Sequence, residues 1–363
     1  MEENKNDIAP ETEEVVNSCN VEAAEVEDTA ADDLQGEALG DRVKTLSPGR
    51  TVLKRFFRSK LSVIGLTVII ALFLISFIGP LFSPWGEQEP DTTRKMTLIT
   101  QEIKYYIDGE QYTAYSLAYQ ETDNIYADPS WNHLLGTDER GLDIFTRLMY
   151  GGRVSLTIGF LVVIVETLLG VVLGGLAGYF GGKVDNVIMR ITDILYCIPQ
   201  LPLMLIFSAV FNGLEITSII RLYYMMGILT LIGWAGVARL VRGQILSLRE
   251  QEFMLAAKCS GLSVGRKIFK HLIPNVMPQL IVSMTLGLGS IILTEATLGF
   301  LGIGAPPGTA TWGAMIQTAN DAYNLSFLPN FWVPPGICIT LAILAFNFVG
   351  DGLRDAFDPK MKR

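Results

Sequence analysis

The residues from which catalytic and metal sites are most often built are scarce in this chain. Its 363 residues include four cysteines and two histidines. The cysteines, at positions 19, 197, 259 and 338, have neither the spacing of a disulfide framework nor that of a zinc site. The histidines, His133 and His271, lie in polar segments that face opposite sides of a membrane in the topology derived below. We therefore expect no metal, no cofactor and no catalytic centre.

A nucleotide-binding loop is also missing. The pattern Gly-x-x-x-x-Gly-Lys-Ser/Thr, whose backbone holds nucleotide phosphates, does not occur, and GGKVDN at residues 181–186 is only a glycine turn beside a lysine. Any ATP hydrolysis that drives this protein must therefore take place in a partner.

Positive charge is almost absent from the N-terminal segment. Residues 1–41 contain fourteen Asp or Glu and a single Lys, whereas the net charge of the whole chain is −9. The rest of the chain is therefore net positive. An acidic segment with few aromatic residues cannot bury a core, so residues 1–50 are predicted to be a disordered tail.

Long apolar runs, in contrast, are abundant. Half of the residues are hydrophobic, and the mean hydropathy is +0.36. A helix needs about 20 mainly apolar residues to cross a bilayer. Six segments reach or approach that length, at residues 61–82, 154–179, 194–211, 223–241, 276–303 and 331–349. We predict an all-α polytopic membrane protein with six transmembrane helices.

Small residues and prolines predict how these helices pack and bend. Glycines at positions 170, 174, 175 and 178 recur at helical spacings, a pattern typical of closely packed membrane helices. Pro199 and Pro202 are expected to bend the third helix.

The distribution of basic residues predicts the orientation. LKRFFRSK at residues 53–60 suits the cytoplasmic interface, which places the N-terminus inside. The chain then divides into an acidic cytoplasmic tail (1–50), an interfacial segment with the first helix (51–82), an extracytoplasmic loop (83–153), a core (154–352) containing a cytoplasmic polar loop (249–275), and a cytoplasmic tail (353–363). In the outer loop, KYYIDGEQYTAYSLAYQ alternates around Asp108-Gly109 and predicts a hairpin within a small subdomain.

The cytoplasmic loop at residues 249–275 is too charged to cross a bilayer and too regular for a linker. Residues 250–258 suit a short helix, Gly261 supplies a stop, and Pro274 is expected to prevent the helix from continuing. Small residues at Ala256, Ala257 and Gly261 would let a partner's backbone approach. An alternative is a basic amphipathic helix that lies on lipid headgroups.

This loop resembles the Glu-Ala-Ala coupling loop of ABC-importer permeases. Ala256, Ala257, Gly261 and Pro274 occupy the positions of the pattern, while Leu255 stands where the family has Glu. Glu252, one helical turn earlier, could replace that glutamate.

Four further blocks extend the resemblance to most of the chain from about residue 51. They lie at residues 133–156, 175–199, 294–316 and 344–360 and look like the C-type permease subunits of dipeptide and oligopeptide ABC importers. The resemblance implies a type I importer fold in the bacterial cell membrane. It also implies a permease subunit for di- or oligopeptides that forms half of the translocation pathway. The implied partners are a homologous permease in a heterodimer, two ABC ATPases and an extracytoplasmic substrate-binding protein, with no nucleic acid. By this resemblance Glu252, Leu255, Ala256, Ala257 and Gly261 dock the ATPase.

Two glutamates within apolar segments are the candidates for the pathway or its gate. Glu166 lies mid-span, and Glu295 lies near the outer end of the fifth span. A charge at that depth costs on the order of 3 kcal/mol, so each is expected to face a neighbouring helix or a water-filled cavity, either as a pathway residue or as a packing residue. Two other functions stay open. One is an ABC permease for nickel chelates or another small solute, and the other is a secondary transporter that uses Glu166 as a proton relay.

Overall fold

The structure, a computed structural model, describes residues 48–93, 95–107, 110–122, 124–214, 218–305 and 308–358. Most of the predicted acidic tail, the Asp108-Gly109 turn and the end of the C-terminal tail lie outside the described residues. Residues 48–50, which we assigned to the disordered tail, begin the helix α2 (Pro48–Arg58). Contacts divide the chain into Met1–Thr51 and Val52–Arg363, and the account below concerns the second unit.

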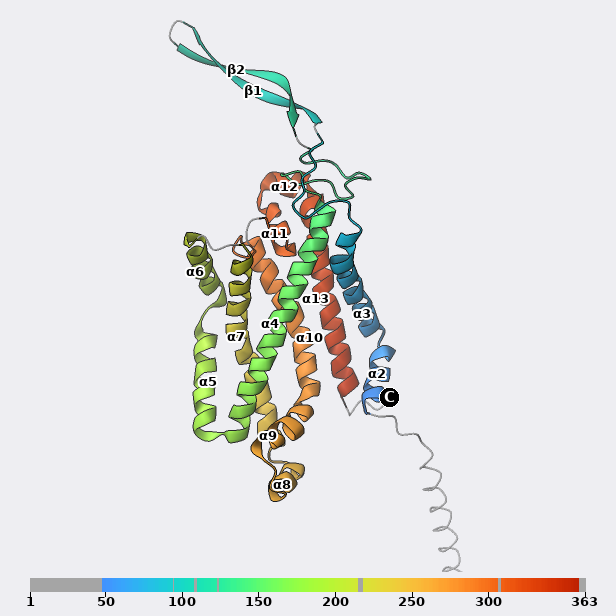
Figure 1. The fold of residues 1–363 in the computed structure, drawn as a ribbon, viewed down its shortest axis with the longest axis vertical. Coiled ribbons are helices and arrows are strands. Elements are labelled where there is room, and N and C mark those ends of the chain that lie inside the picture. Colours follow the sequence, from blue (N-terminus) through green and yellow to red (C-terminus); the bar gives the residue numbers. More distant parts are fainter. Residues whose placement is uncertain are drawn as a thin grey trace, which may run out of the picture. The chain divides into compact units, whose positions relative to one another are not determined.

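Helices make up most of this unit (Figure 1). The first span is helical throughout and consists of α3 (Lys60–Phe73), η1 (Leu74–Ile78) and η2 (Gly79–Leu81). After an outer loop with β1 (Lys95–Ile107) and β2 (Glu110–Thr122), the chain enters the long helix α4 (Ile144–Phe180). The elements that follow are α5 (Gly182–Cys197), α6 (Gln200–Gly213), α7 (Ser218–Leu248), α8 (Glu252–Cys259), α9 (Val264–Arg266), η3 (Lys267–Leu272), α10 (Ile273–Phe300), α11 (Trp312–Ile316), η4 (Gln317–Asn320), α12 (Ala322–Phe327) and α13 (Pro329–Phe357).

Among the residues that the structure describes, five helical segments are long and apolar enough to cross a membrane, and the number rises to six if the bent pair α5 and α6 forms one span. Each predicted segment corresponds to one of them, which confirms the all-α polytopic class. The helices extend beyond the apolar runs, however. Helix α4 begins at Ile144 instead of residue 154, because Asp143 caps it by accepting a hydrogen bond from the Thr146 backbone N–H at 2.7 Å.

The third predicted helix is broken and not merely bent. Helices α5 and α6 meet at an angle of 77°. Pro199 carries no backbone N–H, and Ile198 before it has an extended ψ of 116°, as a residue before proline prefers. The break therefore falls at Pro199, and the helical segment starts at Gly182, earlier than the predicted residue 194.

Our prediction that Pro274 prevents the helix from continuing is wrong. The backbone is helical from Val264 to Phe300. The π-helical segment η3 precedes Pro274, and there the Ile273 N–H donates to the carbonyl of Ile268, five residues back. This wider turn lets the chain reach α10 with the proline in its first turn, where a missing N–H costs least.

The predicted glycine face of α4 packs against α7. A Cβ built at Gly170 would lie 2.5 Å from the Val237 Cβ, and one at Gly178 would lie 2.9 Å from the Ile245 Cβ. At Gly174 the added atom would overlap the backbone carbonyl oxygen of Ala238. These three glycines bring the two helices together. Gly175, the fourth of the predicted set, is less tightly packed, because a Cβ there would lie 3.8 Å from the Ile245 Cδ1 of α7.

Adjacent substitutions on α4 test this packing. Gly174→Ala should destabilise the protein by about 1–3 kcal/mol, because the backbone of α7 has to move away. Gly175→Ala is the matched control, since its nearest neighbours would be at 3.8 Å and 3.9 Å, an ordinary contact distance. Thermal unfolding in detergent should separate the two variants, and equal melting temperatures would contradict the close contact of α4 with α7.

The outer loop contains the predicted hairpin. Strands β1 and β2 pair antiparallel from Lys95↔Thr122 to Ile107↔Glu110. Tyr115, Leu117 and Tyr119 are each at least 70% exposed and alternate along β2, so they share one face of the sheet.

Buried polar side chains fix the base of the outer loop to the start of α4. The ring of His133 is 2% exposed and contacts Asp91 through Nε2 at 3.1 Å and Asp143 through Nδ1 at 3.0 Å. Asp91 also accepts hydrogen bonds from the Thr93 backbone N–H at 2.9 Å and from the Asn124 side-chain amide at 2.6 Å. Since Asp143 is the cap of α4, this network holds the residues before and after the hairpin against the helix.

The network predicts a dependence on pH. Burial by itself would raise the pKa of Asp91, but hydrogen bonds from Thr93, Asn124 and His133 outweigh it and hold this pKa well below its usual range. The stabilisation is therefore complete above the unfolded-state pKa of about 4 and is lost as the pH falls below that value. Trp85 stacks on His133 with ring centroids 4.6 Å apart, so its fluorescence should report the loss.

The substitution Asp91→Asn tests this assignment. It should weaken the loop at neutral pH by about 1–3 kcal/mol and flatten the acid transition of the Trp85 signal. Asp128→Asn, at an exposed position of the same loop, should change neither property. An unchanged acid transition in Asp91→Asn would assign the pH dependence to another group.

Candidate functional site

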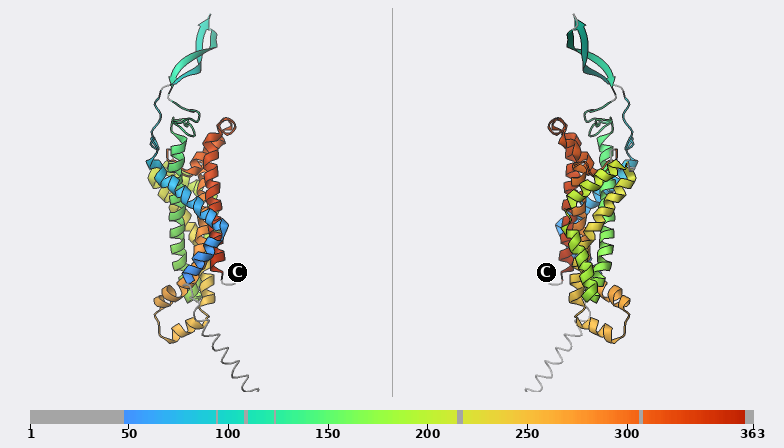
Figure 2. Two further views of the ribbon diagram at one scale, coloured as in Figure 1. Left: turned by 90° about the vertical axis from the view of Figure 1, so that its right-hand side faces the viewer. Right: turned by 90° about the vertical axis from the view of Figure 1, so that its left-hand side faces the viewer.

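The predicted polar loop folds into a short helix with one buried and one exposed face. In α8, Met254 is fully buried and Ala257 is 6% exposed, whereas Leu255 is 63% exposed. Glu252 and Ala256 are exposed as well. In Figures 1 and 2, α8 lies at the end of α7 and α10 that is opposite to α11 and α12. The side chains available to a partner are thus Glu252, Leu255 and Ala256, while Ala257 faces this chain's own core.

Gly261 ends α8 in the way the sequence predicts. Its φ is +67°, in the left-handed region that favours glycine. The Gly261 N–H donates to the Lys258 carbonyl at 3.1 Å, and the Leu262 N–H donates to the Ala257 carbonyl at 3.4 Å. These two bonds define a Schellman motif. A Cβ at Gly261 would have no neighbour within 4 Å, so a partner could approach the turn closely.

Met254 connects α8 to the membrane helices. Its side chain belongs to a buried cluster with Ile245 of α7, Leu272 of η3 and Val276 and Leu280 of α10. A displacement of α8 would therefore act directly on the ends of α7 and α10 that lie next to it, because a close-packed cluster transmits movement instead of absorbing it.

Glu166 lies at the contact between α4 and α7. Its side chain is 7% exposed and lies directly against Gly233, where a Cβ would overlap the carboxylate. The carboxylate borders a cavity of about 170 Å³ that Ser283 and Gly287 of α10 also line. Among the described residues its Oε1 has no hydrogen-bond partner. Glu166 thus faces both a neighbouring helix and a cavity, and its part in transport stays a prediction.

Glu295 lies in a different environment. It is fully buried in α10, and its Oε2 accepts a hydrogen bond from the Ser155 hydroxyl of α4 at 2.8 Å. The Ser155 oxygen in turn accepts from the Trp312 backbone N–H at 3.2 Å, and the Trp312 indole N–H donates to the Leu148 carbonyl at 3.1 Å. Glu295 thereby braces the junction of α4, α10 and α11. The two glutamates lie on different helices, Glu166 on α4 and Glu295 on α10, and they belong to separate sites.

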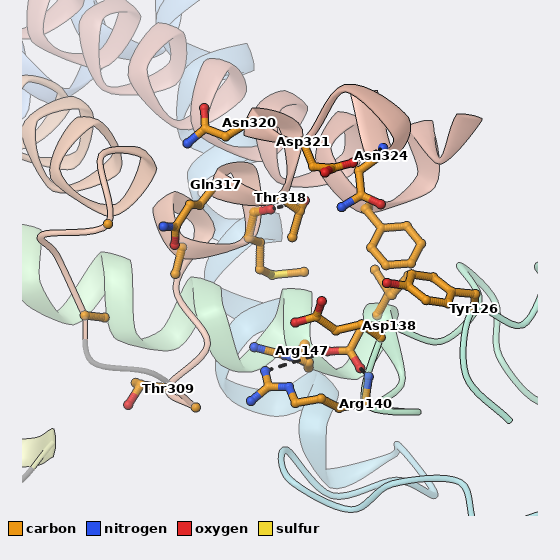
Figure 3. A pocket seen from close by; sticks show the side chains of 18 residues that line it. Tyr126, Asp138, Arg140, Arg147, Thr309, Gln317, Thr318, Asn320, Asp321 and Asn324 are labelled. Atoms are coloured by element: carbon orange, nitrogen blue, oxygen red, sulfur yellow. Dashed lines mark hydrogen bonds and ion pairs between the residues drawn. The ribbon is translucent and has the colours of Figure 1, made fainter. Parts of the chain in front are cut away.

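A pocket at the outer end was not predicted from the sequence. It has a volume of about 520 Å³ and lies between residues 126–147 and residues 302–331. Figure 3 shows Asp138, Arg140 and Arg147 on one side, the polar residues from Gln317 to Asn324 on the other, and Tyr126 at one end. No short-range motif marks this site, because its walls come from two distant segments of the chain.

Tyr126 adopts an unusual backbone conformation. It is the one non-glycine residue with a positive φ, 50°, in the part of the chain that the structure describes. Such a conformation costs a non-glycine residue on the order of 1 kcal/mol and is frequent at functional sites. Burial, together with the negative charges of Glu139, Asp138 and Asp321, raises the pKa of Tyr126. These carboxylates are therefore close enough to act on the phenol.

The fold and its sites define a multi-pass helical membrane protein that presents a short helix at one end and, within the described residues, has no cluster of metal ligands. Comparison with known proteins gives the family. The model of the "Binding-protein-dependent transport system inner membrane component" matches residues 170–363, and that of the "N-terminal TM domain of oligopeptide transport permease C" matches residues 47–98. The chain belongs to the family of binding-protein-dependent inner-membrane transport components.

Similar proteins cover nearly the whole chain. The oligopeptide transport system permease protein OppC of Bacillus subtilis is 36% identical over 90% of this chain and 95% of its own length. The dipeptide permease protein DppC of the same organism is 37% identical over 89% of this chain and 90% of its own length. The glutathione permease protein GsiD of Pectobacterium atrosepticum is 32% identical over 87% of this chain and 92% of its own length. A chain of a MetNI methionine ABC transporter structure has a TM-score of 0.46 and 20% identity, over 58% of this chain and 96% of that one.

The predicted class is confirmed. This chain is a permease subunit of an ABC importer, and ATP hydrolysis belongs to partner ATPases. Members of the family work with ATPases and substrate-binding proteins in general. The alternative of a proton-coupled secondary transporter is not supported.

Proposed function

We propose that this chain imports di- or oligopeptides as one half of a heterodimeric permease. The relatives with 36% and 37% identity are named as oligopeptide and dipeptide permeases and match along almost their full lengths. A homologous permease would supply the other half of the pathway. An extracytoplasmic binding protein would deliver the peptide to the end of the bundle that carries the outer loop.

Basic residues support the proposed orientation. Arg266, Lys267 and Lys270 lie at the end of the helix bundle that carries α8. Lys54, Arg55 and Arg58 lie in α2, just before the first membrane helix α3. Positive charge favours the cytoplasmic side. Both termini and α8 would then face the cytoplasm, in a bacterial plasma membrane.

The observation that best supports the proposed energy coupling is that α8 has one buried and one exposed face. Its exposed residues, Glu252, Leu255 and Ala256, would fit into the ATPase surface, and the open side of Gly261 would let that surface come close. Closure of the ATPase dimer would move α8, and the cluster around Met254 would transmit the motion to α7 and α10. The pathway would then alternate between inward-facing and outward-facing states.

Charge introduced on the exposed face of α8 tests this docking. Ala256→Glu and Gly261→Glu should insert into the membrane normally, while co-purification of the ATPases and substrate-stimulated ATP hydrolysis are lost, because a buried unpaired carboxylate opposes docking.

Gly261→Ala is the matched control. It carries the same backbone strain as Gly261→Glu, about 1–2 kcal/mol, without added charge, and should keep its ATPases. Normal assembly and uptake by Ala256→Glu would refute α8 as the docking element.

A further inference from the structure

The outer pocket is lined by side chains of both charges, and not all of their charged groups are paired within the protein. Asp138 pairs with Arg147 and lies 3.8 Å from Arg140, so one carboxylate faces two guanidinium groups. Arg147 is largely buried, and its Nε has no partner among the described residues. Arg140 is 47% exposed and lies on the same side of the pocket. Asp138 thus lies near two guanidinium groups, and Arg140, the more distant and more exposed of the two, remains available to a ligand.

Negative charge gathers around Tyr126. Glu139 and Asp321 line the pocket, and their charges, with that of Asp138, act on the Tyr126 phenol. Asp321 uses its Oδ1 to cap α12, accepting from the Tyr323 and Asn324 backbone N–H groups at 2.9 Å and 3.1 Å. Glu139 is exposed and has no such structural task in the described part of the chain. The pocket thus contains an acidic site and a basic site within one cavity.

The remaining wall can recognise uncharged polar groups. Gln317 and Asn324 place carboxamide groups along the cavity, opposite the arginines (Figure 3). A carboxamide both donates and accepts hydrogen bonds, as a peptide unit does. The volume of about 520 Å³ lies within the range of small-ligand sites.

We propose that the outer pocket binds a short peptide in its zwitterionic form. Arg140 binds the free carboxylate, Glu139 and Asp321 bind the free ammonium group, and the carboxamides of Gln317 and Asn324 bind the peptide units between them. This inference rests on the proposed peptide cargo and adds a receiving site on the permease itself, between release from the binding protein and entry into the membrane.

The opposed charges favour this ligand over others. An apolar solute would leave the charges of the pocket desolvated without partners, and a simple anion would meet Glu139 and Asp321. A peptide with two free ends satisfies both charged sites at once. A chain segment inside a folded binding protein has no free termini to offer, so blocked peptides distinguish the two occupants.

The test uses the assembled permease pair with its ATPases in lipid nanodiscs, without binding protein. Dissociation constants are measured by saturation-transfer NMR for trialanine, N-acetyl-trialanine and trialanine amide. Arg140→Gln should weaken trialanine binding about tenfold and leave trialanine amide binding unchanged, since each variant removes one charge-assisted hydrogen-bonding group. Glu139→Gln should weaken trialanine binding similarly and leave N-acetyl-trialanine binding unchanged.

Glu102→Gln, at an exposed position of β1, is the control and should bind all three peptides as the wild-type protein does. The proposal is overturned if wild-type protein binds no trialanine at millimolar concentration, or if the pocket variants weaken free and blocked peptides equally. It is also overturned if, in a parallel measurement with the binding protein added, the variants weaken only the association of that protein. ATP-dependent peptide uptake by the wild-type transporter, measured in parallel, tests the cargo separately, so a failed pocket does not count against the importer.

Discussion

The burial of Met254 is the contact on which the proposed coupling of this protein depends. It attaches a helix of eight residues, most of whose side chains are exposed, to the adjacent ends of α7 and α10. Without it α8 would be held only by the small buried side chain of Ala257 and by its flanking turns. With it, a force on the exposed face of α8 acts on two membrane helices at once, because the cluster around Met254 is close-packed.

The rest of the bundle is arranged so that such a force can travel. Three glycines of α4 allow it to approach α7 closely, and the hydrogen bond between Ser155 and Glu295 joins α4 to the outer end of α10. A movement at α8 would therefore reach the region of α11 through these contacts. The cavity beside Glu166 interrupts the contact between α4, α7 and α10, and it leaves room there for a rearrangement.

Much of this architecture follows from short-range patterns. Apolar runs located every membrane segment, glycines at helical spacings located the α4 contact with α7, and Gly261 located the end of α8. Local patterns gave wrong predictions where the conformation of a helix depends on the turn next to it. Pro274 does not end the helix, because a π turn before it accommodates the proline. Pro199 breaks its span completely.

The functional sites were harder to predict from the sequence than the helices, because they depend on tertiary contacts. The sequence identified Glu166 and Glu295 as unusual, but only the fold separates a carboxylate beside a cavity from one that braces three helices. Ala257 is a small residue of the kind expected at a docking surface, yet it faces inward. The pattern of a helix of only eight residues does not determine which of its faces is buried. The outer pocket joins residues almost two hundred positions apart, such as Tyr126 and Asp321, and no motif could have indicated it.

The most direct test of the account uses a transporter with the substitution Met254→Ala. The quantity to measure is the number of ATP molecules hydrolysed per imported peptide. The substitution removes the buried side chain and leaves the exposed face of α8 unchanged, so the ATPases should still bind and hydrolyse ATP. Because a cavity then replaces the link to α7 and α10, the account predicts that more ATP is consumed per imported peptide than in the wild-type transporter. An unchanged ratio, with the ATPases bound normally, would contradict the claim that Met254 carries the coupling.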